Sequence, residues 1–474
     1  MGGVSSRTLS DFIKAYDVRG LVPEQLDAEV ARAIGSAFAE VVAAPEGASS
    51  VVVGYDMRPS SPELSRAFAE GVAGHGLDVV IIGLCSTDGL YYASGAMDLP
   101  GAMFTASHNP AAYNGIKLCR AGARPVGQDS GLARIAEVAQ AVVDGERPLA
   151  PEGVAPGAIG EKDTVEDYAN FLRGLVDLTA IRPLKIVVDA GNGMGGFTVP
   201  AVFAGLPLDV VPLYFELDGT FPNHEANPLD PANLVDLQKA VVEHGADLGL
   251  AFDGDADRCF VVDERGEPVS PSVITALVSA REVARAVAGG AEAKDVTIVY
   301  NVISGHVVRE VIAEVGARGL RSRVGHSFIK AEMAAHDAVF GGEHSAHYYF
   351  RDFWFADTGM LSALHVLAAL GEQDAPLSEL VAEYDRYPAS GEINSKVASV
   401  AEATQRVLDW ASAKDVDVDS LDGITVTSRD EQAPMWWFNL RPSNTEPLLR
   451  LNVEAADEAT MASVRDEVLA VVRA

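Results

Sequence analysis

Runs of β-branched residues alternate with Ala-rich stretches along the first three quarters of the chain. Residues 51–54 form a Val-rich run typical of a buried strand, residues 62–74 are typical of a helix, and residues 79–82 form a second strand-like run. Alternation of this kind favours a parallel or mixed sheet covered by helices. The N-terminal part of the chain is therefore predicted to fold as an α/β unit.

The same order of runs occurs twice more. One set has strand-like residues at 186–189, 210–211 and 248–252 around a Gly-rich turn, and the other has strand-like residues at 296–300 and 338–340 around a helical stretch at 307–315. The repetition predicts three related α/β units, each with a mixed sheet of its own.

After Ser390 the pattern changes to a helix, then strand-like runs at 424–427, 436–440 and 448–453, and a final helix. A smaller α+β domain is expected there. Pro- and Gly-containing stretches mark candidate linkers near 149–160, 263–268 and 371–376. The predicted domains are therefore 1–150, 151–264, 265–373 and 374–474.

Length and composition agree with a multidomain globular protein. A chain of 474 residues is too long to fold around a single hydrophobic core. Its 48% hydrophobic residues and mean hydropathy of +0.12 are typical of a globular protein with a well-buried interior. The formal net charge of −32 argues against nucleic-acid binding, which needs a basic surface. An anionic substrate would therefore need a local cluster of Arg and Lys side chains.

The cysteines and the hydropathy of the chain indicate the cellular compartment in which the protein is expected. Cys85, Cys119 and Cys259 lie far apart without a CxxC spacing, so neither a disulfide framework nor a zinc site is expected. No apolar run approaches transmembrane length, and the N-terminus lacks the apolar stretch of a signal peptide. We expect a cytoplasmic protein with no membrane partner.

The first loop suited to chemistry is Thr-Ala-Ser-His-Asn-Pro at 105–110, followed by Asn-Gly-Ile-Lys at 114–117. Asn-Pro and Asn-Gly both mark turns, so Ser107 is expected on an exposed loop. A serine hydroxyl is a weak nucleophile unless a base, a charge or a metal activates it, and His108 and Lys117 are near in sequence. A capping turn rich in Ser and Asn is the alternative interpretation.

The second loop is Asp-Gly-Asp-Ala-Asp-Arg at 253–258. Its three carboxylates can converge on one hard cation if the glycine lets the loop curl. Glu264 at the twelfth position suggests an EF-hand, but Arg258 stands where an EF-hand requires glycine, and strand-like runs flank the loop. The loop therefore predicts a metal site.

Two later loops carry polar groups suited to a sugar phosphate. The segment 341–348 presents Glu, Ser and His at alternate positions, which suits sugar hydroxyls but also describes an exposed strand edge. The segment 441–447 is a Pro-containing loop that carries one Arg guanidinium and the hydrogen-bond donors of Ser, Asn and Thr side chains. This second segment is predicted to clamp a phosphate, with an ordinary β-turn as the alternative.

Taken in order, these loops resemble the α-D-phosphohexomutase family, in its phosphomannomutase/phosphoglucomutase branch. The matching motifs span nearly the whole chain: KAYDVRG at 14–20, TASHNP at 105–110, DGDADR at 253–258, GEHSAH at 342–347 and RPSNTEP at 441–447. The resemblance implies three related α/β mixed-sheet domains and a smaller C-terminal α+β domain around a central cleft.

The roles of the site residues come from this resemblance. It implies a phosphorylated Ser107 that joins three aspartates in holding one Mg²⁺ per chain: Asp253, Asp255 and Asp257. The implied catalytic residues are Ser107, Arg19, His108, Lys117 and Arg258, with the general acid or base left open between Lys117, His108 and His347. The implied substrate-binding residues are Tyr16, His326, Glu343, Ser345, His347, Arg441, Ser443, Asn444 and Thr445.

One departure from the family pattern concerns the third domain. Relatives often place a lysine after its first strand to help bind phosphate, whereas Tyr-Asn-Val-Ile-Ser at 300–304 contains none. That contact is expected to be missing or to be made by another residue.

The resemblance implies an isomerase that interconverts hexose 6-phosphate and hexose 1-phosphate through a phosphoserine. Hexose 1,6-bisphosphate would be both intermediate and activator. A phosphoglucosamine mutase is the nearest alternative, whereas a metal-dependent sugar phosphatase and a non-catalytic sugar-phosphate or calcium binder are rivals from other classes. The expected partners are small hexose phosphates, and the chain is expected to be a monomer or a homodimer.

Overall fold

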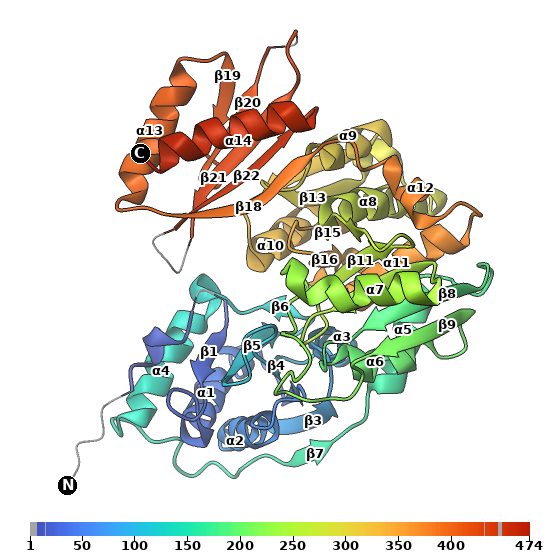
Figure 1. The fold of residues 1–474 in the computed structure, drawn as a ribbon. Coiled ribbons are helices and arrows are strands. Elements are labelled where there is room, and N and C mark those ends of the chain that lie inside the picture. The colour runs from blue at the N-terminus through green and yellow to red at the C-terminus, as the bar shows by residue number, and fades with distance from the viewer. Residues whose placement is uncertain (1–6, 15, 431, 444–447) are drawn as a thin grey trace. The chain divides into compact units, whose positions relative to one another are not determined.

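The computed structural model describes residues 7–14, 16–430, 432–443 and 448–474, and Figure 1 names its elements. The chain forms two compact units. The first joins the residues up to Val269 with Ser345–Leu377, and the second joins Ser270–His344 with the residues from Ser378 onward.

The first unit begins with a mixed sheet in the order β1-β5-β4-β2-β3-β7, with β6 beside β5. Strand β2 runs parallel to β3 and β4, whereas β5 runs antiparallel to β4 and β1. The strands are β1 (Val18–Leu21), β2 (Ser50–Tyr55), β3 (Asp78–Leu84), β4 (Gly101–Phe104), β5 (Tyr113–Arg120), β6 (Arg124–Pro125) and β7 (Ile159–Glu161). The helices are α1 (Ala28–Phe38), α2 (Ser61–Ala73), α3 (Thr87–Met97) and α4 (Leu132–Val143).

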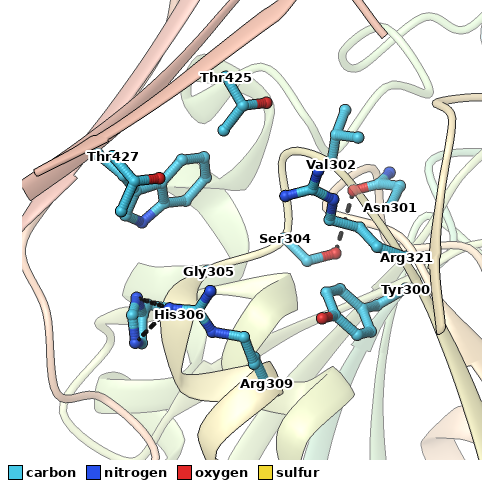
Figure 2. A pocket seen from close by; sticks show the side chains of 11 residues that line it. Tyr300, Asn301, Val302, Ser304, Gly305, His306, Arg309, Arg321, Thr425 and Thr427 are labelled. Carbon is cyan, nitrogen blue, oxygen red and sulfur yellow. Dashed lines mark hydrogen bonds between the residues drawn. The ribbon is translucent and has the colours of Figure 1, made fainter. Parts of the chain in front are cut away.

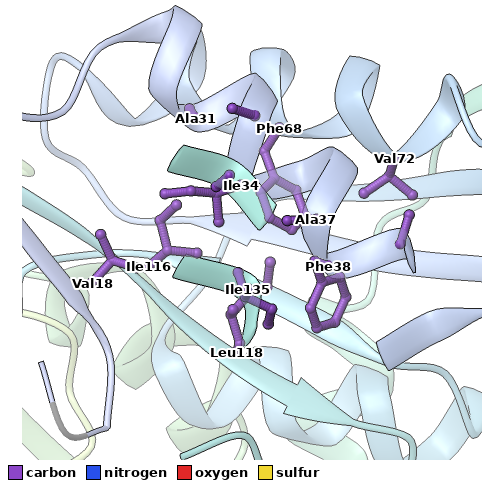
Figure 3. Close-up of a cluster of buried hydrophobic side chains, with 14 of the residues drawn as sticks. Val18, Ala31, Ile34, Ala37, Phe38, Phe68, Val72, Ile116, Leu118 and Ile135 are labelled. Carbon is purple, nitrogen blue, oxygen red and sulfur yellow. The ribbon is translucent and has the colours of Figure 1, made fainter. Parts of the chain in front are cut away.

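The core of this domain lies between the sheet and helices α1, α2 and α4. Figure 3 shows Ile34 and Phe38 of α1 beside Phe68 of α2 and the strand residue Ile116, all fully buried. Burial of each such side chain stabilises the fold by about 1.5–3 kcal/mol. Helices α1 and α2 pack closely because Gly35 has no side chain: a Cβ there would lie 2.1 Å from the carbonyl oxygen of Phe68.

The second sheet of the first unit has the order β12-β11-β10-β8-β9. Strand β8 runs parallel to β9 and β10, and β11 returns antiparallel to β10, so the connection between β10 and β11 is a tight turn at one end of the sheet. The elements are α5 (Val165–Leu175), β8 (Leu184–Asp189), α6 (Gly195–Phe203), β9 (Leu208–Leu213), α7 (Val235–His244), β10 (Leu248–Phe252), β11 (Cys259–Asp263) and β12 (Pro268–Val269).

A later stretch of the chain completes the first unit. Strands β16 (Tyr348–Phe350) and β17 (Ala356–Asp357) pair antiparallel, and helix α11 (Gly359–Gly371) follows them. Every residue of α11 is buried, which agrees with its almost wholly apolar sequence.

The second unit contains a parallel group of strands in which β13 pairs with both β14 and β15. Its elements are α8 (Pro271–Ala288), β13 (Thr297–Asn301), α9 (His306–Glu314), β14 (Arg318–Ser322), α10 (His326–His336), β15 (Phe340–Gly342) and α12 (Leu377–Ala382), which begins at the boundary residue. The alternation of strands and helices matches the sequence prediction for a third α/β domain.

The C-terminal domain of the second unit is an antiparallel sheet in the order β18-β22-β21-β20-β19, covered by α13 and α14. Its elements are β18 (Ala389–Lys396), α13 (Val400–Ser412), β19 (Val416–Asp419), β20 (Ile424–Ser428), β21 (Trp436–Pro442), β22 (Leu448–Ala455) and α14 (Glu458–Val472). The sequence pattern missed β18 and β19 because both are edge strands with mostly exposed, polar residues.

The predicted fold class of α/β domains followed by an α+β domain is therefore confirmed. Among the described helices, none combines the length and the apolar character that a membrane crossing needs.

Candidate functional site

Ser107 occupies a strained turn directly after β4. Its φ of +49° lies in the left-handed region, and its backbone N–H donates to Thr105 Oγ1 at 2.9 Å. The sequence prediction of a loop is confirmed, but the prediction that Ser107 is exposed is wrong: the residue is only 3% exposed. The reason is tertiary, since the turn between β10 and β11 covers it.

The hydroxyl of Ser107 meets a carboxylate from the second sheet. Ser107 Oγ donates to Asp253 Oδ2 at 2.8 Å, and His108 Nδ1 lies 3.2 Å from the same hydroxyl. The two loops touch because Gly254 has no side chain: a Cβ there would lie 2.4 Å from the carbonyl oxygen of Ser107. The close approach explains why glycine follows the first aspartate of the loop.

The predicted metal loop brings its three aspartates together. Asp253, Asp255 and Asp257 are buried, and each offers an oxygen within 4.8 Å of the others. Strands β10 and β11 flank the loop, so the EF-hand alternative is excluded. Within the part of the chain that the structure describes, the buried Oδ1 atoms of Asp255 and Asp257 have no hydrogen-bond partner. Orphaned carboxylate oxygens of this kind fit a bound cation.

Lys117 lies beside the same carboxylates. Its Nζ donates to Asp255 Oδ2 at 2.7 Å and to Asp257 Oδ2 at 2.5 Å. Burial works against the charge of Lys117, but the two carboxylates outweigh it and hold the pKa of the ammonium well above its ordinary value. Burial also raises the pKa of Asp253, whereas Lys117 and His347 lower the pKa of Asp257 against its burial.

Arg258 connects the metal loop with the nucleophile loop. Its Nε donates to Asp253 Oδ2 at 2.9 Å, and its terminal nitrogen lies 2.8 Å from His108 Nδ1. An arginine can only donate, so His108 Nδ1 is the acceptor and carries no proton in this arrangement. Burial, together with the positive charges of Arg258 and Arg19, lowers the pKa of His108 well below its ordinary value.

Arg19 reaches the nucleophile loop from β1. It donates to Asp17 Oδ2 at 2.8 Å and to the side-chain oxygen of Asn109. Burial opposes its charge, but Asp17 and the more distant Asp255 outweigh that effect and raise its pKa. Tyr16, the other predicted residue of this motif, lies half-buried just before β1.

Sequence reasoning missed Arg58, which is 1% exposed. Its guanidinium donates to four main-chain carbonyls that belong to the nucleophile loop and the start of β5: Ser107 at 2.9 Å, Asn109 at 2.7 Å, Pro110 at 3.0 Å and Tyr113 at 2.9 Å. The Nε of Arg58 lies 3.3 Å from its counter-ion, Asp56 Oδ2. The only signal in the sequence was a charged pair directly after a buried strand.

The first residues of α3 also form hydrogen bonds to the predicted metal loop, and the sequence did not predict these contacts. Thr87 donates from Oγ1 to Asp255 Oδ2 at 2.6 Å and from its backbone N–H to the carbonyl of Asp255 at 3.0 Å. Next to it, Asp88 accepts hydrogen bonds from Tyr168 and Thr358, and burial raises the pKa of Asp88 to about 6. The first turn of α3 thus fixes the orientation of one candidate metal ligand.

Ser345 and His347 of the predicted sugar loop lie in the first unit. Ser345 Oγ and His347 Nδ1 are 3.0 Å apart, and His347 Nε2 lies 3.6 Å from Asp257 Oδ1. His347 also forms a backbone bridge with Arg258. The structure therefore places His347 against the predicted metal loop, where it forms a second group of possible metal ligands with Asp257 and Asp357.

Glu343, from the same predicted loop, lies in the second unit. It is 2% exposed, and its Oε1 accepts hydrogen bonds from Gly325 N at 3.0 Å and Asn301 Nδ2 at 3.3 Å. His326 follows Gly325 as the first residue of α10 and is half-buried. Two predicted sugar-binding segments, around 325 and 343, are thus adjacent within this unit.

The predicted phosphate clamp begins at the end of β21. Arg441 donates to Glu392 Oε2 at 2.7 Å, and its pKa is lowered by burial and by the charge of Arg450, against the effect of Glu392. Among the described residues, the buried Nε of Arg441 meets no acceptor. Arg450 donates to Ser443 Oγ at 3.5 Å. The remaining predicted clamp residues, Asn444 and Thr445, lie outside the described residues.

Comparison with known proteins agrees with this arrangement. Four domain models of the phosphoglucomutase/phosphomannomutase family match: alpha/beta/alpha domains I, II and III at 11–142, 166–266 and 273–387, and the C-terminal domain at 392–471. Together they cover most of the chain and all five motifs.

Individual relatives match along almost their whole length. The phosphohexose mutases protein of Xanthomonas campestris pv. campestris is 39% identical over 456 residues, which are 96% of this chain and 97% of the relative. The phosphomannomutase of Escherichia coli K12 is 38% identical over 463 residues, with the same coverage of 96% and 97%.

Solved structures show the same likeness. A phosphoglucomutase/phosphomannomutase family protein from Burkholderia thailandensis superposes with a TM-score of 0.85 at 31% identity, over 97% of this chain and 96% of that one. Since the domain models, the full-length relatives and the fold all agree, this chain belongs to the phosphoglucomutase/phosphomannomutase family.

Proposed function

We propose that the chain interconverts hexose 6-phosphate and hexose 1-phosphate reversibly, as a phosphomannomutase/phosphoglucomutase. Ser107 carries the phosphoryl group, and hexose 1,6-bisphosphate is the intermediate that turns around between the two transfers. The observation that carries the proposal is the contact of Ser107 Oγ with Asp253 at 2.8 Å, inside a buried cluster of carboxylates and cations. Family membership along the whole chain supports it.

Phosphoryl transfer depends on positioning and charge neutralisation more than on covalent assistance. The residues around Ser107 fit this requirement. Arg258 and Lys117 contact the carboxylates beside the hydroxyl, and Arg19 contacts the nucleophile loop. Their positive charges form the local cationic cluster that an anionic substrate needs in a chain of net charge −32.

The three aspartates are proposed to hold one Mg²⁺, with an oxygen of phosphorylated Ser107 as a further ligand. The Oδ1 atoms of Asp255 and Asp257, which accept no hydrogen bond from the described residues, support the fit. When bound, the cation neutralises charge on the transferred phosphoryl group. Thr87 keeps Asp255 in place through its two hydrogen bonds.

Lys117 is our proposal for the residue that transfers a proton to or from the sugar oxygen. Asp255 and Asp257 hold its pKa well above the ordinary value, which favours the direction in which Lys117 donates the proton. His108 is less suited because its Nδ1 already accepts a hydrogen bond from Arg258. His347 is held between Ser345 and Asp257. We assign His108 and His347 to positioning of the charged groups instead.

The sugar and its phosphate are proposed to be bound by Tyr16, His326, Glu343, Ser345, His347, Arg441, Ser443, Asn444 and Thr445. The buried carboxylate of Glu343 suits hydrogen bonds from sugar hydroxyls. The Nε of Arg441, which lacks an acceptor among the described residues, suits a phosphate oxygen.

Hexose 1,6-bisphosphate is further proposed as the activator, because Ser107 must carry a phosphoryl group before the first turnover.

A cytoplasmic location is proposed on the evidence of three free, buried cysteines.

A coupled assay tests the function. Purified enzyme is given Mg²⁺, catalytic glucose 1,6-bisphosphate and mannose 1-, glucose 1- or glucosamine 1-phosphate in turn. Turnover of the mannose and glucose substrates is expected. Faster turnover of glucosamine 1-phosphate would identify a phosphoglucosamine mutase instead, and release of inorganic phosphate without isomerisation would identify a phosphatase.

A further inference from the structure

A cavity of about 50 Å³ lies within the second compact unit, where the end of β13 and the start of α9 face β20 and β21 of the C-terminal domain. Figure 2 shows Arg309 and Arg321 reaching it from the α/β domain, with Thr425 and Thr427 on the opposite side. Its volume exceeds the roughly 10–15 Å³ that one water needs. None of these four residues has a role in the proposed reaction.

Positive charge dominates the lining. The Arg309 guanidinium lies 2.8 and 2.9 Å from the two ring nitrogens of His306, and none of the described carboxylates lies within ion-pair distance of it. Arg321 pairs with one carboxylate, Asp419. Burial and the charge of Arg309 both lower the pKa of His306, and burial and Arg309 likewise lower the pKa of Arg321.

The nearby carboxylates are engaged elsewhere. Glu310 contacts His306 at 3.4 Å but also accepts hydrogen bonds from Arg386 at 3.0 Å and Tyr387 at 2.7 Å. Glu454 accepts from the backbone N–H of His306 at 2.7 Å and from Trp437 Nε1 at 2.6 Å. The exposed side chain of Arg309 therefore has no carboxylate within ion-pair distance among the described residues, and its charge is available to an incoming anion.

Neutral donors complete the lining. Thr425 Oγ1 accepts a hydrogen bond from Asn439 at 3.0 Å, which leaves its hydroxyl hydrogen able to donate. The hydroxyls of Ser304 and Thr427 also line the cavity, and α9 points its positive N-terminal end at it. Two guanidinium forks and several hydroxyls suit the oxygens of a phosphate group, which has acceptors on every side.

We propose that this cavity binds one phosphate group, as inorganic phosphate or as the phosphoryl end of a small phosphate ester. The bound anion would neutralise Arg309 and bridge the α/β domain to the C-terminal domain that carries Arg441. The proposal goes beyond the proposed mutase activity, because neither Arg309 nor Arg321 has a role in the proposed reaction.

Equilibrium dialysis of the whole chain with radiolabelled inorganic phosphate, at constant ionic strength, tests the site. All proteins carry Arg441→Met, so that the proposed substrate clamp does not contribute. Arg309→Met and Arg321→Met are each expected to weaken the remaining binding by about tenfold or more, since each removes a charged donor. Arg318→Met, on the same strand as Arg321 but exposed, removes the same charge and is expected to bind like the parent.

Circular dichroism and the melting temperature in chloride show whether each variant folds. If Arg309→Met does not fold, Arg309→Lys replaces it. Lysine keeps the positive charge but lacks the planar guanidinium, so this variant is expected to bind phosphate more weakly than the parent. Unlabelled glucose 6-phosphate distinguishes the sources: displacement of the label shows that the cavity admits a phosphate ester, and no displacement shows that it takes free phosphate. Binding that is equal in the Arg309, Arg321 and Arg318 variants, or absent from the parent, would overturn the proposal.

Discussion

The buried guanidinium of Arg58 donates a hydrogen bond of 2.9 Å to the main-chain carbonyl of Ser107. The same side chain binds three further carbonyls of the loop, so one residue fixes both ends of the turn that carries Ser107. The positive φ of Ser107 requires such support, because the left-handed conformation costs free energy in a residue other than glycine.

Arg58→Lys should therefore lower kcat without a matching change in KM. Lysine keeps the charge next to Asp56 but cannot reach four carbonyls in the planar arrangement that a guanidinium offers. We expect kcat to fall by about tenfold or more, from a displacement of the nucleophile. Steady-state kinetics with mannose 1-phosphate measures the effect, and Arg66→Lys on the exposed face of α2 is the control. A proportional rise in KM with unchanged kcat would contradict the positioning role.

Ser107→Ala should abolish mutase activity and the phosphoryl group on the protein. Only a hydroxyl at this position both contacts Asp253 and can carry the phosphate. Intact-protein mass spectrometry should find one phosphate on the wild type and on Ser130→Ala, whose serine is exposed, and none on Ser107→Ala. A phosphate mapped to a different serine would show that the nucleophile is misassigned.

Asp255→Asn should weaken metal binding and slow phosphoryl transfer. The change removes one negative charge from three buried carboxylates and disturbs the contacts of Asp255 with Thr87 and Lys117. Losing about 2.7–4 kcal/mol of electrostatic stabilisation slows the reaction about a hundredfold or more. Metal titration of chelator-treated enzyme followed by activity assay measures both effects, with exposed Asp129→Asn as the control. Full activity of chelator-treated wild type without added cation would reject the metal site.

Mannose and glucose substrates should have kcat/KM values within about two decades of each other. They differ only at C2, and one hydrogen bond to that hydroxyl is worth about 0.5–1.5 kcal/mol. Glu343→Ala should reduce kcat/KM for both substrates about equally if Glu343 contacts the hydroxyls that the epimers share. Glucosamine 6-phosphate should react more slowly than either. A loss confined to one epimer would instead place Glu343 at C2.

His224 should make the stability of the first unit depend on pH. Burial opposes its protonation, but the hydrogen bond and charge of Asp189, 3.0 Å away, outweigh that effect and raise the pKa of His224. When a pKa is higher in the folded state than in the unfolded state, protonation of the group stabilises the fold. This contribution to the free energy of unfolding is complete below the pKa of the unfolded state and is lost as the pH rises through the pKa of the folded state.

His224→Gln should therefore lower the melting temperature more at about pH 5.5, below the unfolded pKa of about 6.5, than at about pH 8.5, well above it. The free energy involved should not exceed about 1 kcal/mol, because the pair is partly solvated. Thermal unfolding at both pH values measures the difference, with exposed His244→Gln as the control. An equal fall in melting temperature at both pH values would show that His224 and Asp189 stabilise the fold only through packing.

The pattern of hydrophobic runs was enough to predict several central strands and the helices α2 and α9, because those elements bury apolar residues. Strands β2, β8, β10 and β13 coincide with Val-, Ile- and Leu-rich segments that are buried in the structure. Edge strands β18 and β19 escaped prediction, since a strand with solvent on most of its length needs no apolar run.

The sequence by itself determined which loops are candidates for chemistry, because hydroxyl, carboxylate and guanidinium groups recur there in short, ordered motifs. Only the tertiary structure decided that Ser107 is buried, that Lys117 bridges Asp255 and Asp257, and that Arg58 holds the nucleophile turn. The contacts of Arg58 and Lys117 join residues 49 to 140 positions apart. Distances of that kind depend on which strands pair and on how closely Gly254 lets two loops approach, and no local pattern encodes them.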